Sequence, residues 1–220
     1  MEPFRIPADL LGLSAHYPNA RDLARVARSG GEAARVSIAR LWLSEGVPFA
    51  FRDCPGIYES LRTWLSAWLG VHAKEIGITG SAQIGSSLAP RKLGAPFDND
   101  SDLDLFVIST GLFSEMREDF RRWSFDFERN ACKPNNKREA GFWKDNLTRG
   151  QRLIQRGFLD QKMVPNLPEY PTIKKISQGM WVLVEKLKLT DRAPTPAMAS
   201  LRCYSSWDTF VNQVSLSLQS

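Results

Sequence analysis

The chain has 220 residues, of which 43% are hydrophobic and seven are tryptophan, so it can bury a core without disulfide bonds. Its three cysteines lie far apart without a Cys-x-x-Cys spacing, and no apolar run approaches the roughly 20 residues of a membrane span. We therefore expect a cytoplasmic protein with no zinc site and no membrane partner. The net charge of +5 favours binding of anions, but Lys and Arg are scattered along the chain and therefore identify no particular ligand.

The first elements expected along the chain are helical. Residues 20–45 are rich in Ala and Arg and predict two short helices that are broken at Gly30–Gly31. We interpret residues 1–52 as a helical N-terminal extension, either an appendage or an arm that binds a protein partner. Residues 53–220 then form the main domain with helices at its C-terminal end.

The main domain is predicted to begin with a core helix within residues 53–70. Apolar side chains recur there at helical spacing, with Asp53 as an N-terminal cap, Pro55 in the first turn and Gly70 at the exit. A short strand over 74–79 follows and delivers the chain to Gly80.

The remaining elements alternate between strands and helices. We predict a strand after Asp102 and helices within 111–130, 172–189 and 206–218, the last with Ser206 as a cap. Residues 133–141 are polar and turn-rich and predict an exposed loop, and residues 154–165 fit either a strand or a short helix. This order is typical of an α+β fold in which helices pack on a mixed sheet.

Two acidic residues stand where an apolar strand begins, in the segment SDLDLFVI. Alternate side chains of a strand share a face, so Asp102 and Asp104 are neighbours on one surface. Two such carboxylates repel each other unless a cation lies between them. Mg²⁺, which takes one or two carboxylates and fills its other positions with water and substrate phosphates, suits this arrangement.

A Gly-Ser pair lies upstream, after the strand over 74–79. If a helix begins at Ser81, its free backbone N–H groups and the Ser81 hydroxyl form an anion site, and Gly80 allows close approach of a phosphate. A phosphate site beside a carboxylate pair predicts binding of a nucleoside triphosphate with its metal.

At these residues the chain resembles the DNA polymerase beta-like nucleotidyltransferase superfamily, whose motif is an apolar residue, Gly-Ser, a spacer and Asp-x-Asp in an apolar strand. Here the motif is ITGS followed by SDLDLFVI. The resemblance implies the fold of that superfamily, with Gly80 and Ser81 holding the triphosphate and Asp102 and Asp104 binding Mg²⁺ or Mn²⁺. It also implies a third carboxylate on a neighbouring strand.

The spacer between Ser81 and Asp102 is longer than is usual in the superfamily. The additional residues form either a lid that carries Arg91 and Lys92 onto the phosphates or the continuation of a longer helix from Ser81. Both residues are therefore candidate nucleotide-binding residues.

Asp160 is the candidate for the third carboxylate. It lies in QRGFLDQKMV, where a strand can bring an acid among apolar residues, whereas Asp126, Asp145 and Asp208 fall in a helix, a polar segment and a helix start. The same stretch also fits a helix, and a site without a third acid is the alternative.

Other charged residues have simpler interpretations. Asp98 and Asp100 are expected to be turn residues, and the arginines of 117–122 lie among acids, which favours a solvated helix face over an RNA-binding patch.

Two function classes follow. The first is a metal-dependent nucleotidyltransferase that moves a nucleoside monophosphate from a nucleoside triphosphate, such as ATP, to a hydroxyl of protein, RNA or another nucleotide. The alternative is a catalytically inactive module of the same fold that binds a nucleotide or a protein partner, as an antitoxin does.

Overall fold

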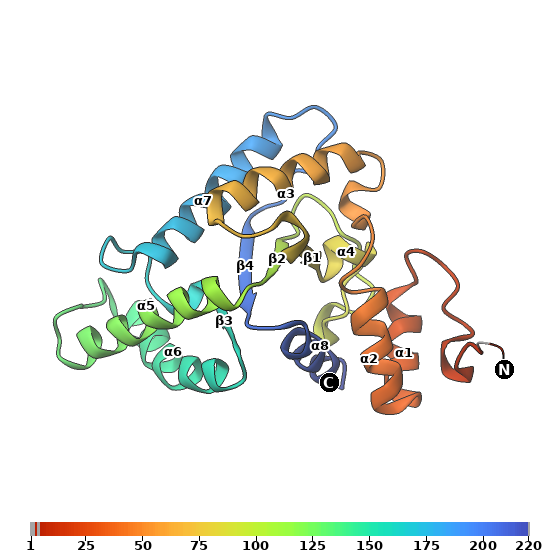
Figure 1. Ribbon diagram of the computed structural model, residues 1–220, viewed down its shortest axis with the longest axis horizontal. Coiled ribbons are helices and arrows are strands. Elements are labelled where there is room, and N and C mark those ends of the chain that lie inside the picture. The colour runs from red at the N-terminus through yellow and green to blue at the C-terminus, as the bar shows by residue number, and fades with distance from the viewer. Residues whose placement is uncertain (1–2, 4, 220) are drawn as a thin grey trace.

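A four-stranded mixed sheet lies at the centre of the computed structural model, which describes residues 3 and 5–219 (Figure 1). The strand order is β1-β2-β4-β3, with β2 antiparallel to β1 and parallel to β4, and with β3 antiparallel to β4. The strands are β1 (Ile76–Thr79), β2 (Leu103–Ile108), β3 (Phe158–Asp160) and β4 (Ala199–Tyr204).

Eight α-helices accompany the sheet in the described part of the chain, so the protein has the predicted α+β class. None of these helices is long and apolar enough to cross a membrane. They are α1 (Ala20–Ser29), α2 (Gly31–Leu41), α3 (Pro55–Leu69), α4 (Ser81–Ile84), α5 (Thr110–Glu128), α6 (Lys137–Gln155), α7 (Pro171–Lys188) and α8 (Trp207–Ser217).

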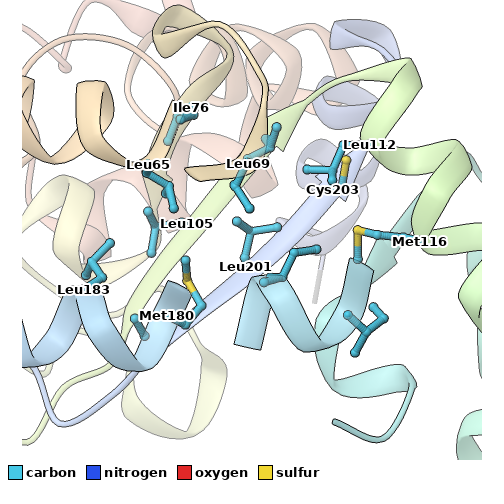
Figure 2. Packing of buried hydrophobic residues seen from close by; sticks show 14 of the residues in the cluster. Leu65, Leu69, Ile76, Leu105, Leu112, Met116, Met180, Leu183, Leu201 and Cys203 are labelled. Carbon is cyan, nitrogen blue, oxygen red and sulfur yellow. The ribbon is translucent and has the colours of Figure 1, made fainter. Parts of the chain in front are cut away.

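One face of the sheet is packed against α3, α5 and α7. Leu103, Leu105 and Val107 alternate along β2 and point to this side, where they join a large cluster of buried apolar residues. Figure 2 shows Leu105 and Leu201 of the sheet among side chains of the three helices. Since burial of each such side chain contributes about 1.5–3 kcal/mol, this cluster is the principal core.

The other face is only partly covered. Phe106 and Ile108 of β2 point to this side and form a second buried cluster with residues of α1, α2 and α8. In Figure 1 these three helices lie on one side of the sheet, and α5 and α6 lie on the other side of the molecule. The helices of residues 1–52 thus contribute to a core that they share with α8, while the predicted boundary at residue 52 stays a prediction.

A close approach between β1 and β2 allows the aromatic ring of Phe106 to lie over the sheet. Gly77 pairs with Phe106, and a β-carbon at position 77 would lie 2.3 Å from the ring. Only glycine fits there without displacing Phe106, whose ring also packs against Phe210 of α8.

Several helix predictions are confirmed. The break at Gly30–Gly31 separates α1 from α2, and Gly70 ends α3 in the left-handed conformation with φ 76°. Ser206 caps α8 by accepting a hydrogen bond from the backbone N–H of Thr209. The cap of α3 is a correction, because Cys54 and not Asp53 precedes its first turn.

The prediction of an exposed loop over 133–141 is wrong in its second half. α6 begins at Lys137, and the Asn136 side chain accepts a hydrogen bond from the backbone N–H of Glu139. The polar residues that suggested a loop are therefore a helix cap and the solvated side of a first turn.

One acid of the supposed solvated face of α5 is buried. Arg121 does pair with Glu118, at 4.0 Å, but Asp119 is 3% exposed and accepts a hydrogen bond from the backbone N–H of Ile173, at 2.9 Å. Asp119 thus satisfies the first turn of α7, a role that only the packing of α5 on α7 creates.

Candidate active site

Polar side chains gather on the second face of the sheet, where α1, α2 and α8 leave it open. β1 and β3 end at the edge where β2 and β4 begin, so residues from all four strands meet there. They line a pocket with a volume of about 120 Å³. Its lining consists of Thr79, Asp104, Leu105, Phe106, Asp160, Ser200, Arg202 and Tyr204.

Asp104 is fixed between two neighbouring strands. It pairs with Thr79 of β1 and with Ser200 of β4, and the Ser200 hydroxyl donates a hydrogen bond to its Oδ1 at 2.8 Å. Part of the side chain is exposed to solvent, but the surrounding protein removes enough water for burial to raise the pKa of Asp104. The Ser200 hydrogen bond lowers this pKa, and the charge of Asp102 raises it further.

Gly80 brings the Gly-Ser pair against this carboxylate. Its backbone has φ 71° and ψ −149°, a combination that is essentially restricted to glycine. A β-carbon at this position would lie 3.5 Å from Oδ2 of Asp104. The two parts of the sequence motif, which lie 24 positions apart in the chain, are therefore neighbours in space.

Ser81 begins α4, as predicted, but the helix is a single turn. The backbone N–H of Gln83 donates to the Gly80 carbonyl at 3.1 Å, and the helix ends at Gly85 with φ 88°. A β-carbon on Gly85 would meet the ring of Phe49 at 2.7 Å, so no larger residue fits there unless Phe49 moves. The long spacer is thus a loop after α4 and not an extension of that helix.

The loop does not place Arg91 and Lys92 in the pocket. Both are exposed on a short turn at Pro90–Lys92, and neither side chain lines the pocket or forms an ion pair within the described residues. The loop residues Leu88 and Leu93 pack instead against the second core cluster, beside the N-terminal helices. Gly80, Ser81 and Asp102 also lie outside the lining of this small pocket, so a role of Arg91 and Lys92 toward a longer phosphate chain stays a prediction.

Asp102 immediately precedes β2 and is exposed. The hydrogen bond from the Leu103 N–H to the Met198 carbonyl, at 2.8 Å, fixes the chain at this point beside the segment that leads into β4. Asp98 is a turn residue, as predicted, since its carboxylate accepts hydrogen bonds from the Asp100 N–H and the Ser101 hydroxyl.

Asp160 lies on a strand and lines the same pocket as Asp104, but its carboxylate has other partners. It accepts hydrogen bonds from the Lys162 N–H at 2.9 Å and from Arg202 at 3.4 Å. In the sheet register, Asp104 of β2 lies opposite Ser200 of β4, whereas Asp160 of β3 lies opposite Arg202, two positions farther along β4 and on its other side. The strand spacing then puts the two aspartate α-carbons roughly 12 Å apart.

The predicted cluster of Asp102, Asp104 and Asp160 is accordingly not formed as a three-carboxylate group. Over residues 3 and 5–219, no three His, Cys, Asp or Glu side chains come together with metal-binding geometry. The donor set of Asp102 and Asp104 still fits one Mg²⁺, because this ion is bound by one or two carboxylates and keeps water and phosphate oxygens as its other ligands.

Arg202 is a partly exposed cation that lines the pocket and that was not predicted from the sequence. It pairs with Asp160 on one side, and its guanidinium lies 5.7 Å from the centre of the Phe158 ring. Burial lowers the pKa of Arg202, but the nearby Tyr204 and Asp160 outweigh it, so the pKa is raised and the group is cationic at every physiological pH.

A sequence signal for Arg202 and Ser200 exists in the segment ASLRCY. Polar Ser200 and Arg202 alternate with apolar Leu201 and Cys203, which is the pattern of a half-buried strand. The pattern predicts that both polar residues share a face, but it does not show which strand they join.

Asp104, with Gly80 on one side and Ser200 on the other, is thus the best-defined functional group of the pocket. The site combines this carboxylate with the positively charged side chain of Arg202. Comparison of the chain with protein-family models, with curated proteins and with solved structures found no match.

Proposed function

We propose that the chain is a metal-dependent nucleotidyltransferase with the DNA polymerase beta-like fold. The observation that carries the proposal is the contact between Gly80 and Asp104, since it joins a glycine that leaves room for a phosphate to a carboxylate suited to a cation. Strand β1, the one-turn helix α4 and strand β2 have the order that the superfamily motif implies.

Asp102 and Asp104 are the residues that would hold Mg²⁺ or Mn²⁺. The charge of Asp102 and the burial of Asp104 both oppose ionisation of Asp104, and a cation between the two carboxylates relieves this cost. When bound, such an ion neutralises charge on the phosphate oxygens.

The other residues have positioning roles. Ser200 orients the Asp104 carboxylate through its hydrogen bond, and Gly80 and Ser81, at the start of α4, would hold the triphosphate. Arg202, held by Asp160, supplies a second positive charge for phosphate oxygens. In the reaction, the acceptor oxygen bonds to the α-phosphorus, the bond from this phosphorus to the bridging oxygen breaks, pyrophosphate leaves, and the hydroxyl proton passes to water. Such a transfer requires chiefly positioning and charge neutralisation.

An inactive nucleotide-binding or partner-binding module is the second candidate. The observation in its favour is the pairing of Asp160 with Arg202, which engages the only acid proposed as third ligand. Such a site has an arginine to bind phosphate but one carboxylate fewer to activate an acceptor hydroxyl.

Incubation with labelled ATP, GTP, CTP and UTP, with Mg²⁺ or Mn²⁺, tests the two candidates. An enzyme yields labelled protein, RNA or nucleotide, and Asp104→Asn yields none. Binding of the triphosphates without any product supports the inactive module. Absence of both binding and product would overturn the enzyme and the nucleotide-binding module and leave only a module that binds a protein partner.

A further inference from the structure

The net positive charge of the protein arises in one segment, although Lys and Arg are scattered along the whole chain. Residues 129–156 contain eight Lys or Arg and two Asp or Glu, a net charge of +6. The other 192 residues contain 21 basic and 22 acidic side chains. The loop before α6 and α6 itself therefore account for the entire net charge of +5.

Arg149 and Arg152 of α6, together with Arg156 directly after its last residue, form a basic surface. Arg149, Arg152 and Arg156 lie within about 60° of one another around the helix and span about 10 Å along its axis. All three are exposed and together with Leu153 they surround a pocket of about 200 Å³. Within the described residues, none of the three forms an ion pair or a side-chain hydrogen bond.

This surface is held rigidly by contacts on the opposite side of α6. A β-carbon on Gly150 would lie 2.1 Å from the ring of Phe120, so α6 approaches α5 very closely at this turn. Trp143 is buried in the principal core, and the Asn146 side chain donates a hydrogen bond to the Lys162 carbonyl at 3.0 Å. The three guanidinium groups are thus carried by a fixed helix.

The basic surface is close to the candidate active site. α6 leads directly into β3, so the α-carbon of Arg156 is at most about 13 Å from that of Asp160. Leu153, which also lines the basic pocket, packs against the cluster that contains Tyr204, and Tyr204 lines the active-site pocket. A chain molecule of a few nucleotides can span the two sites.

We propose that Arg149, Arg152 and Arg156 bind the phosphate backbone of a nucleic-acid strand. Guanidinium groups form paired hydrogen bonds to phosphate oxygens, and three of them at this spacing fit successive phosphates of one strand. A nucleic acid bound in this way would be the acceptor of the transfer step, which rests on the proposed function. Binding of the strand is a separate property of the protein.

Other interpretations account for less of this surface. Cations at a helix C-terminus stabilise its dipole, but this effect is confined to the last turn and does not explain Arg149 or the charge of the preceding loop. A helix that lies on a membrane inserts an apolar face, whereas the exposed positions between these arginines are Gln151 and Gln155.

The test is binding of a fluorescently labelled 12-nucleotide single-stranded RNA, measured by anisotropy over a range of salt concentrations. Replacing Arg149, Arg152 and Arg156 by Gln should weaken binding on the order of 100-fold at 0.1 M salt and reduce the slope of log affinity against log salt by about 2. The matching Arg→Lys triple variant should retain the slope, since it keeps the charges. Unchanged affinity and slope in the Gln variant would overturn the proposal.

A matched control replaces three exposed cations outside α6, Arg28, Arg40 and Lys175, by Gln. An equal loss of RNA binding in this control would show that only net charge matters and would overturn the site.

Single-stranded DNA of the same sequence distinguishes RNA from DNA, and stronger binding to an acidic peptide or to anionic vesicles would overturn the nucleic-acid assignment. Asp104→Asn should bind RNA normally, which separates failure of this site from failure of the proposed reaction.

Discussion

The carboxylate of Asp104 and the hydroxyl of Ser200 face each other across two parallel strands, with the Ser200 Oγ 2.8 Å from Oδ1. The other oxygen of Asp104 faces Gly80. One carboxylate is thereby held between the serine of β4 and the glycine of the sequence motif. Its orientation depends on three segments that are far apart in the chain.

Asp104→Asn should abolish stabilisation by metal and nucleotide. Mg²⁺ with ATP, at about 100 times its Kd, should stabilise the wild type by about 2.7 kcal/mol and leave the variant unchanged. Thermal unfolding with and without ligand measures both values. Equal stabilisation of the two proteins would contradict the role of Asp104.

The same substitution should stabilise the metal-free protein at neutral pH. Burial raises the pKa of Asp104 in the folded state, so the folded protein holds this proton more tightly than the unfolded chain does. The stabilising contribution is present below the unfolded-state pKa of about 3.9 and is lost as the pH rises through the folded-state pKa. Asn does not titrate, so the free energy of unfolding should fall less between pH 4 and pH 7 in the variant than in the wild type. Denaturant unfolding curves at the two pH values measure this difference, and an equal fall in both proteins would contradict the prediction.

Ser200→Ala should shift metal binding to higher pH. The hydroxyl lowers the pKa of Asp104, so its removal raises that pKa and lets protons compete with the metal at a higher pH. Loss of a hydrogen bond to a charged group costs about 1.5–3 kcal/mol. Titrations with Mn²⁺ between pH 5 and 8 measure the shift, and Ser60→Ala, a serine that bonds within α3, is the control. An unchanged pH profile would show that Ser200 does not orient the carboxylate.

Asp160→Asn and Arg202→Gln should have the same effect if Asp160 serves to hold Arg202. Each variant should weaken triphosphate binding, the double variant should lose little more than either single variant, and Asp160→Asn should leave Mn²⁺ affinity unchanged. Calorimetry with the metal alone and with the triphosphate separates these quantities. A loss of metal affinity in Asp160→Asn alone would identify Asp160 as a third metal ligand.

Gly80→Ala should destabilise the fold by about 1–3 kcal/mol, because its backbone conformation is strained for any other residue. The new methyl group would also lie beside Oδ2 of Asp104 and hinder phosphate. Gly56→Ala in α3, where an added β-carbon meets nothing within 4 Å, is the control and should be neutral or stabilising. Urea denaturation compares the two, and equal stability would contradict the strain at Gly80.

Local patterns in the sequence predicted the helices that form the core and the two halves of the motif. α3, α5, α7 and α8 have apolar residues at helical spacing, and Ser109 and Ser206 cap α5 and α8 from the positions just before them. The turn at Gly80 and the strand after Asp102 could also be predicted locally. A glycine after a short strand and a run of apolar residues are both visible within a few positions of the chain.

The tertiary structure alone decided what surrounds Asp104. β4 lies between β2 and β3, so Ser200 meets Asp104, and Arg202 pairs with Asp160 and keeps it from the predicted three-carboxylate cluster. The sequence could not settle this arrangement, because strand order depends on hydrogen bonds between segments nearly 100 residues apart. In the same way, the burial of Asp119 depends on where α7 packs, whereas the periodicity of α5 fixes only the face on which this residue lies.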